Sequence, residues 1–309
     1  MLIMKYLIRQ DILDKTPEIE ITAEKYAELG KAHNILTNAL AIEEKYEILI
    51  ANYLDFEKQI LDTAIECMVR ENYNLQNFFE FRLKLNTRIV NLLTAVRLYQ
   101  DQAKQNVPKC VPNNIDAQTI VKKFFSKEFD ENVDYQFMEG LRNYVQHKGL
   151  PVHWTQLDRK RISVENDFSL EYSIELGSRR SYLEEDRSAT YKYKSSVLTK
   201  YDNKIDLKAA TRNYVESIGN VHESIRSLTT QSVSLAREII EETHRKYLAV
   251  YNGHLVALSA SEWSDKEQIS SIPLLLDWDD IRVKLQERNK KTINLKKRYI
   301  TSIIKNFDA

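Results

Sequence analysis

The sequence predicts a mainly α-helical protein: a bundle of long helices with a small β-containing insertion and a long C-terminal helical part. Three observations predict this class. Glycine and proline, which interrupt helices, number 6 and 5 among 309 residues. Long segments repeat apolar residues every three or four positions, the spacing of a helix that buries one side. One shorter segment alternates apolar and polar residues, which is typical of a strand.

The first long helix is predicted across residues 42–67. A stripe of largely apolar residues runs along it in steps of four and three: Ile42, Tyr46, Leu49, Tyr53, Phe56, Ile60, Thr63 and Cys67. Charged residues such as Glu43, Glu47, Glu57 and Lys58 are assigned to the other face. The helix is therefore expected to bury one side only.

A second long helix is predicted from about Asn74 to Lys104, and its apolar arc is wide. One stripe contains Leu75, Phe78, Leu85, Ile89, Leu92, Val96 and Tyr99, and an adjacent stripe contains Phe79, Leu83, Val90 and Leu93. Arg82, Asn86 and Arg97 fall in register with these stripes, so we expect them to be partly buried and to need polar partners. They are either structural groups between helices or functional ones.

The first bundle is predicted to span residues 1–150. A loop is expected at 106–114, where two prolines and several asparagines occur, followed by a short helix at about 115–125. The next helix is predicted over 134–148, with Asp134 as its N-cap. Gly149 and Pro151 supply a strong stop signal after it.

Residues 151–205 are predicted to form a strand-containing insertion, because residues 168–176 alternate in polarity and 152–157 and 161–164 are rich in strand formers. Residues 206–309 are predicted to be C-terminal helices that pack on the bundle or mediate dimerisation. The first of them, at about 206–247, carries a seven-residue spacing supported by companion isoleucines. The spacing joins Leu207, Tyr214, Val221, Leu228 and Leu235, and the companions are Ile218, Ile225 and Ile239.

Two features near the C-terminus have alternative interpretations. The stretch Tyr251 to His254 reads as a helix end or as a hairpin turn, and we favour the helix end. The last helix, predicted from about Trp278 to Ile304, contains the markedly basic segment from Arg282 to Arg298. A solvated helix face accounts for this segment more simply than an RNA-binding track does.

Composition and motifs exclude several classes of protein. The 45 basic and 45 acidic side chains cancel, so the chain as a whole has no electrostatic signature of nucleic-acid binding. Two cysteines, no leader pattern and no long apolar run predict a soluble, cytoplasmic protein that does not cross a membrane. Glycine-rich phosphate loops, zinc-ligand spacings and a nucleophile elbow do not occur, so no cofactor and no metal are expected.

The stretch "RNYVQH" at 142–147 is the strongest candidate for a chemical site. "RNYV" recurs at 212–215, but that copy lacks both the histidine and the helix stop. On a regular helix Asn143 and His147 share a face, whereas Arg142 and His147 diverge by about 140°. The two could converge if the last turn loosens, or if two subunits face each other across a twofold axis.

An arginine, a polar residue and a histidine in this spacing, at the end of a helix in a helical bundle, resemble the signature of the HEPN superfamily. Active members of that superfamily are metal-independent ribonucleases. The resemblance covers about the first 150 residues and implies that His147 is a general acid or base, that Arg142 holds phosphate, and that Asn143 orients the histidine or the RNA. It also implies a homodimer, RNA as substrate, and a neutralising protein partner of the toxin–antitoxin or antiviral-defence kind.

Substrate contacts are assigned to Lys148, His153, Arg82 and Asn86. His153 and the neighbouring Trp154 would either stack on a base or pack in a small core, and packing is favoured for Trp154. The competing hypothesis is a non-catalytic helical interaction or scaffold protein, in which the polar residues of the motif tie helices together and the long helices assemble with a partner.

Overall fold

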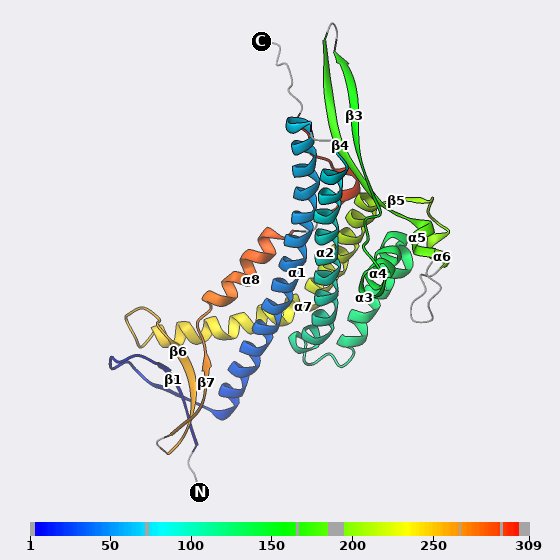
Figure 1. Ribbon diagram of the computed structural model, residues 1–309. Coiled ribbons are helices and arrows are strands. Elements are labelled where there is room, and N and C mark those ends of the chain that lie inside the picture. Colours follow the sequence, from blue (N-terminus) through cyan, green and yellow to red (C-terminus); the bar gives the residue numbers. More distant parts are fainter. Residues whose placement is uncertain are drawn as a thin grey trace. The chain divides into compact units, whose positions relative to one another are not determined.

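The computed structural model describes residues 4–71, 74–164, 167–184, 195–265, 267–290 and 293–302. Within these residues the protein is mainly α-helical, with eight α-helices and two small antiparallel sheets (Figure 1). The chain forms two compact units. Unit 1 comprises residues 1–49, 97–124 and 222–290, and unit 2 comprises residues 50–96, 125–221 and 291–309. Each unit therefore draws on three separate stretches of the chain.

Helix α1 spans Ala23–Arg70 and contributes to both units. The Thr22 hydroxyl accepts a hydrogen bond from the Lys25 amide at 3.2 Å and so caps the first turn. The predicted stripe is confirmed, because all eight of its members, from Ile42 to Cys67, are buried. The assignment of Glu43 to a solvated face is wrong, because its side chain is buried.

Helix α2 spans Leu75–Cys110. Its stripe is buried from Leu85 to Tyr99, but Leu75, Phe79 and Leu83 are exposed, contrary to the prediction. Arg97 is exposed too and pairs with Asp101 at 2.8 Å. Burial along α2 thus begins near its second turn, because packing partners and not the apolar pattern decide where a helix face is covered.

The predicted loop at 106–114 is shorter than expected, because α2 continues through Pro108 to Cys110. A proline removes one backbone donor, and a helix tolerates that loss near its last turn more easily than in its middle. Helix α3 spans Ala117–Glu131 and α4 spans Val133–His147. The stop at Gly149 and Pro151 is confirmed by the end of α4.

The insertion contains the predicted strands, which lie in unit 2. Strand β3 (Trp154–Val164) pairs over its whole length with residues 167–177 of β4 (Asp167–Arg179), and the two form a ribbon that extends past the helices of that unit (Figure 1). Strand β5 (Lys204–Asp206) adds to the base of β4, and the short helices α5 (Arg180–Glu184) and α6 (Ser195–Leu198) lie between β4 and β5 in the chain.

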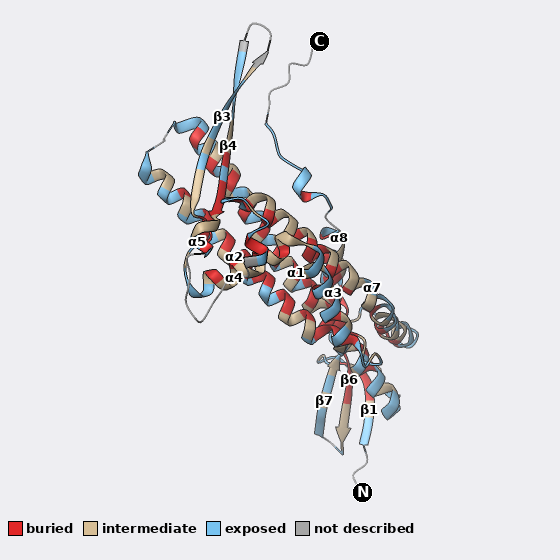
Figure 2. Cartoon of the chain, turned by 90° about the vertical axis from the view of Figure 1, so that its right-hand side faces the viewer, coloured by how far each residue is buried: buried red, intermediate tan, exposed pale blue. Residues whose placement is uncertain are grey.

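Helix α7 spans Leu207–Leu248, close to the predicted range. Leu207, Tyr214 and Val221 of the heptad series are buried, but Leu235 is 57% exposed and Ile240 is buried in its region instead. A straight helix drifts about 20° per heptad against a strict seven-residue spacing, so the buried stripe moves off the series along 42 residues. The colouring by burial shows the resulting core as red faces along the long helices (Figure 2).

Unit 1 contains a second sheet that the sequence analysis did not identify. Its strands are β1 (Met4–Gln10), β2 (Ile19–Ile21), β6 (Leu258–Ser264) and β7 (Glu267–Pro273), in the antiparallel order β2-β1-β6-β7. Strands β1 and β6 are about 250 residues apart in the chain but pair over seven positions, from Met4 with Ser264 to Gln10 with Leu258. A pairing over that sequence distance leaves no local signal.

The C-terminal helix is shorter than predicted. Helix α8 spans Asp277–Arg288 and a 3-10 turn, η1, spans Leu295–Lys297, so no single helix covers 278–302, and residues 303 and 304 lie outside the described part of the chain. The stretch from Tyr251 to His254 lies in the connection after α7 and forms no hairpin turn. No helix among the described residues is both long enough and apolar enough to span a membrane.

Candidate functional site

The RNYVQH motif lies on α4 in unit 2. The helix is capped by Asn132, whose side-chain oxygen accepts hydrogen bonds from the amides of Asp134 at 2.9 Å and Tyr135 at 3.2 Å. Asp134, the predicted cap, is already inside the first turn. Its carboxylate instead accepts hydrogen bonds from the Tyr201 hydroxyl at 2.7 Å and from the Asn213 amide. It therefore ties α4 to α7 and to the segment before β5.

Arg142 is held by two neighbours on the same helix. Its Nε lies 3.6 Å from the Glu139 carboxylate, too long for a hydrogen bond, and its Nη1 donates to Gln146 at 3.2 Å. Glu139 also accepts a hydrogen bond from the Tyr214 hydroxyl at 2.7 Å. Arg142 thus belongs to a polar connection between α4 and α7, and its side chain is 17% exposed.

Arg142 and His147 of the motif do not converge within one chain. Asn143 is half-buried, and His147 and Lys148 are exposed at the C-terminal end of α4. Since α4 is regular through His147, Arg142 and His147 keep the divergence of about 140° that the spacing predicts. Tyr144 lies about 60° from His147 around the helix, so these two residues share a side of α4 that Arg142 does not.

The second RNYV copy, on α7 in unit 2, is structural. Arg212 forms a bidentate pair with Glu57 of α1, with both N···O distances at 2.7 Å, and it donates to the Arg298 carbonyl at 3.1 Å. Asn213 donates to Asp134. The Arg, Asn and Tyr side chains that this copy shares with residues 142–145 each connect α7 to another segment of the chain.

His153 forms a junction at the base of the ribbon. Its Nδ1 accepts a hydrogen bond from the Arg179 amide at 2.9 Å, and its Nε2 lies 3.4 Å from the Tyr144 hydroxyl. Burial lowers the pKa of the imidazole below its usual value. Its ring also lies beside that of Tyr182, with 5.1 Å between centroids. His153 therefore connects α4, the ribbon and α5.

The two polar residues of α2 contact the same segment. Asn86 is buried and accepts a hydrogen bond from the Val152 amide at 2.8 Å, while Arg82 donates to the His153 carbonyl at 3.4 Å. Trp154 packs as expected: an added Cβ on Gly177 would lie 2.6 Å from its ring. The structure thus brings Arg82, Asn86 and His153 together, and Tyr144 joins them to α4.

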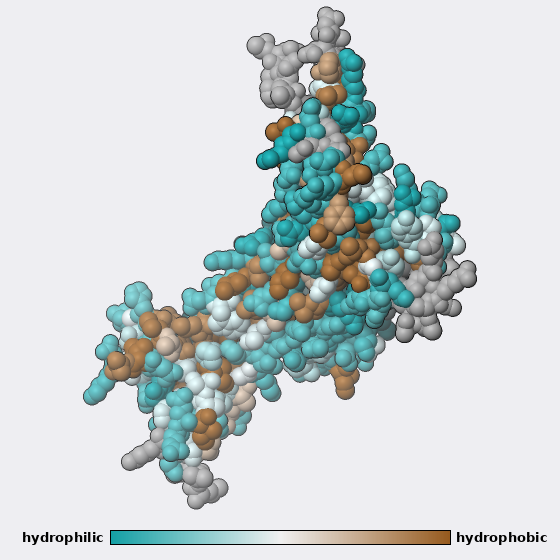
Figure 3. All heavy atoms as spheres, viewed as in Figure 1, coloured by the Kyte–Doolittle hydropathy of each residue, from teal (hydrophilic) through white to brown (hydrophobic). Residues whose placement is uncertain are grey.

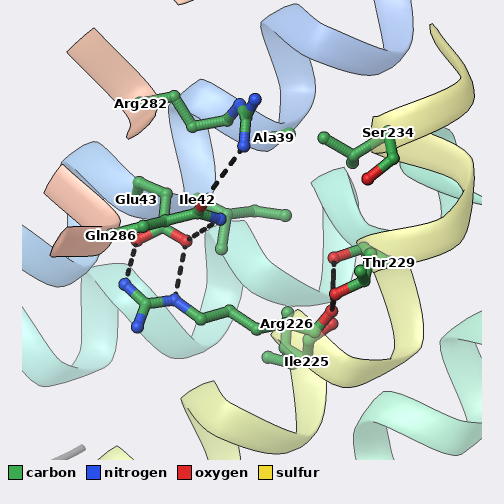
Figure 4. Close-up of a pocket in the computed structure, with 11 residues that line it drawn as sticks. Ala39, Ile42, Glu43, Ile225, Arg226, Thr229, Ser234, Arg282 and Gln286 are labelled. Atoms are coloured by element: carbon green, nitrogen blue, oxygen red, sulfur yellow. Dashed lines mark hydrogen bonds and ion pairs between the residues drawn. The ribbon is translucent and has the colours of Figure 1, made fainter. Parts of the chain in front are cut away.

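A buried polar cluster in unit 1 was missed by the sequence analysis. Glu43 of α1 accepts two hydrogen bonds from Arg226 of α7, at 2.9 and 2.6 Å, and one from Gln286 of α8 at 3.1 Å (Figure 4). It also lies 3.2 Å from His222 Nε2. Burial raises the pKa of Glu43, but the hydrogen bonds from His222 and Arg226 outweigh it and lower the value to about 2. A cavity of about 80 Å³ adjoins the cluster.

The His222 ring is enclosed on all sides. It stacks on Tyr46 with 3.7 Å between centroids, and its Nδ1 lies 2.9 Å from the Tyr99 hydroxyl. A carboxylate only accepts hydrogen bonds, so Nε2 carries the proton toward Glu43 and Nδ1 accepts from Tyr99. One signal could have found this cluster: His222 and Arg226 are four residues apart on the buried side of α7, where polar groups need a shared partner.

Comparison with known proteins finds no matching family model, no matching curated protein and no matching solved structure. Among the residues that the structure describes, no group of three or more histidine, cysteine, aspartate or glutamate side chains is placed to hold a metal ion. Both cysteines are buried and unbridged, and burial raises the pKa of the Cys110 thiol to about 12.

Proposed function

We propose that the protein is a cytoplasmic, metal-independent endoribonuclease of the HEPN type, with His147 as its general acid or base. One observation carries the proposal: the His147 side chain is exposed at the end of α4, on the side of the helix where Tyr144 lines an open pocket. An exposed imidazole is accessible to RNA and can serve as a proton donor or acceptor at the reacting oxygens.

The proposed reaction is an internal transesterification. The ribose 2′-oxygen attacks the adjacent phosphorus, the bond from phosphorus to the 5′-oxygen breaks, and the products carry a 2′,3′-cyclic phosphate and a 5′-hydroxyl. His147 takes the proton from the 2′-hydroxyl or supplies one to the departing 5′-oxygen. Neither step needs a redox cofactor or a water molecule as nucleophile.

Arg142 would stabilise the phosphate through its forked donors, and Asn143 would orient the histidine or the RNA. Because Arg142 and His147 diverge on one helix, the composite site is proposed to form across a homodimer, with each residue from a different protomer. Arg142 would then exchange its bond to Gln146 for a phosphate oxygen. A neutralising partner protein, as in toxin–antitoxin or phage-defence systems, belongs to the same proposal.

The test is cleavage of a mixture of structured and unstructured RNA by purified protein in the presence of a chelator. We expect fragments with cyclic phosphate ends, lost in His147→Ala and in Arg142→Ala. His254→Ala is the matched control, because His254 is also an exposed histidine but lies outside the motif. Cleavage that persists in both motif variants would contradict the proposal.

A second candidate is a non-catalytic interaction protein, and one observation favours it. Large apolar side chains are exposed in unit 2 around the pocket that Tyr144 lines and the pocket next to it. They are Leu75, Phe79, Leu83, Leu150 and Tyr182. An apolar patch of this kind is typical of a contact surface. A wild-type protein that cleaves none of the RNAs but assembles in solution, with assembly lost in Phe79→Ala, would support this candidate.

A further inference from the structure

Two adjoining pockets in unit 2 form one groove between α2 and the base of the β3–β4 ribbon. Phe79, Arg82 and His153 line both pockets, so the two are continuous. The outer part adds residues of the ribbon as far as Arg159, and the inner part adds Tyr144, Leu150 and Tyr182. Apolar residues reach the surface near the base of the ribbon (Figure 3).

The lining has an unusual chemistry for a surface groove. It includes five aromatic side chains in addition to histidine: Phe78, Phe79, Tyr144, Trp154 and Tyr182. It also includes two arginines, and no aspartate or glutamate is among the described residues that line it. The groove therefore offers ring faces and positive charge together, with no carboxylate to repel an anion.

Arg82 is available to an anion. Its guanidinium lies 5.7 Å from the Phe79 ring centroid and donates to the His153 carbonyl at 3.4 Å. Within the described part of the chain, no ion pair joins it to an acidic side chain. Phe79 itself is 57% exposed, so its ring has free surface next to this charge.

One face of the ribbon also carries apolar, aromatic and basic side chains beyond the groove. Residues opposite each other in an antiparallel pair point to the same side, and Leu157, Arg159 and Arg161 lie opposite Ile174, Tyr172 and Leu170. This face carries no acidic residue at these positions, whereas the other face places Asp158 and Lys160 opposite Ser173 and Glu171. On the first face Arg161 lies over the Phe168 ring, 4.0 Å from its centroid.

We propose that this groove, together with the adjoining ribbon face, binds a single-stranded nucleic acid. Unpaired bases stack on Phe79 and Tyr182, and phosphates pair with Arg82 and Arg159. Single strands expose the base faces that such stacking needs, while a duplex hides them. The lining holds two arginines and no carboxylate, so it favours a polyanion over an apolar peptide, which would bury this positive charge without supplying a negative one.

The groove is a binding site in its own right, and it would also explain how a strand reaches His147. Tyr144 and Leu150, which precede and follow His147 in the chain, both line its inner part. A strand seated in the groove would therefore leave it beside the end of α4. Binding by the groove does not require ribonuclease activity, so the two proposals can fail separately.

The test uses fluorescein-labelled oligothymidine of about 20 nucleotides, which cannot be cleaved by transesterification because it lacks 2′-hydroxyls. Anisotropy titrations of the full-length protein are compared with a DNA duplex of equal length. We expect tighter binding of the single strand, weakened about tenfold by Phe79→Ala through lost stacking. Arg82→Ala should also weaken it and should reduce the slope of log affinity against log salt by about 0.7, whereas Phe79→Ala leaves that slope unchanged.

Arg97→Ala is the matched control, because Arg97 is an exposed arginine of the same helix that already pairs with Asp101. Far-ultraviolet circular dichroism checks that each variant is folded. Equal binding by wild type, Phe79→Ala and Arg82→Ala, or a preference for the duplex, would overturn the proposal. No binding of the single strand would overturn it too, and self-association lost in Phe79→Ala would then assign the groove to a contact between copies of the chain.

Discussion

His222 and Glu43 form a buried hydrogen-bonded pair, with 3.2 Å between His222 Nε2 and Glu43 Oε2 and both side chains at most 3% exposed. The same carboxylate also pairs with Arg226, at 2.6 Å. Removing the charge of Glu43 leaves the Arg226 guanidinium under-compensated inside the protein, and three predictions depend on this pair.

Glu43→Gln should lower the free energy of unfolding by about 3 kcal/mol, because breaking one side of a buried ion pair leaves the other charge uncompensated. Urea unfolding followed by circular dichroism measures the change. Glu44→Gln is the control, since Glu44 is half exposed and its 3.7 Å pair with Lys45 should contribute less than about 1 kcal/mol. Equal effects of the two substitutions would contradict the assignment.

Stability should fall as the pH drops below about 6.5, because burial lowers the pKa of His222 below its usual value of 6.5. Between the two pKa values the unfolded chain binds a proton that the folded chain does not, so acid favours unfolding. His222→Gln should reduce the slope of unfolding free energy between about pH 7 and pH 5, by at most about 1.4 kcal/mol per pH unit. The control is His254→Gln, and an unchanged slope in His222→Gln would refute the prediction.

The carboxylate should add a second phase at lower pH. The folded pKa of Glu43, about 2, lies below its usual value of 4.5, so its contribution is complete above about 4.5 and is lost as the pH falls toward 2. Glu43→Gln should therefore flatten the stability profile in that window and leave the phase near pH 6 largely in place. A profile that is flattened only above pH 5 would show that another group titrates.

Gly177→Ala should destabilise unit 2 by at least about 2 kcal/mol. A Cβ at Gly177 would lie 2.6 Å from the Trp154 ring and closer still to the Ile205 carbonyl of β5, and backbone cannot yield as a flexible side chain does. Gly30→Ala is the contrast. Its Cβ would lie 3.3 Å from the terminal methyl group of Ile272, and Gly30 lies inside α1, where alanine favours the helix. Tryptophan fluorescence and urea unfolding measure both effects.

Asn86→Ala should cost about 1 to 3 kcal/mol, because it leaves the buried Val152 amide without its acceptor. Thr87→Ala is the matched control on the next, exposed residue, whose hydroxyl donates to a carbonyl of its own helix at 3.0 Å. Loss of nucleic-acid binding in Asn86→Ala without any loss of stability would show instead that Asn86 contacts a ligand and is not chiefly a structural group.

Local patterns predicted much of the helical structure. The stripe from Ile42 to Cys67 is buried throughout, α7 matches its predicted range closely, and the polarity alternation in 168–176 belongs to β4. These features follow from the periods of helix and strand, which are properties of neighbouring residues. One prediction for the RNYVQH site also followed from neighbouring residues, because the divergence of Arg142 and His147 depends only on the geometry of one helix.

Other features depend on residues that are distant in the chain. Whether Phe79 is buried, which carboxylate Arg212 meets, and which strand pairs with β1 are decided by partners far along the sequence. By itself the sequence determined the mainly helical class, the ribbon and the place where α4 stops, because these follow from local periodicity and from glycine and proline. Tertiary structure alone decided the burial of Glu43 and the groove beside the ribbon, because charge compensation and surface shape arise only when separate segments meet.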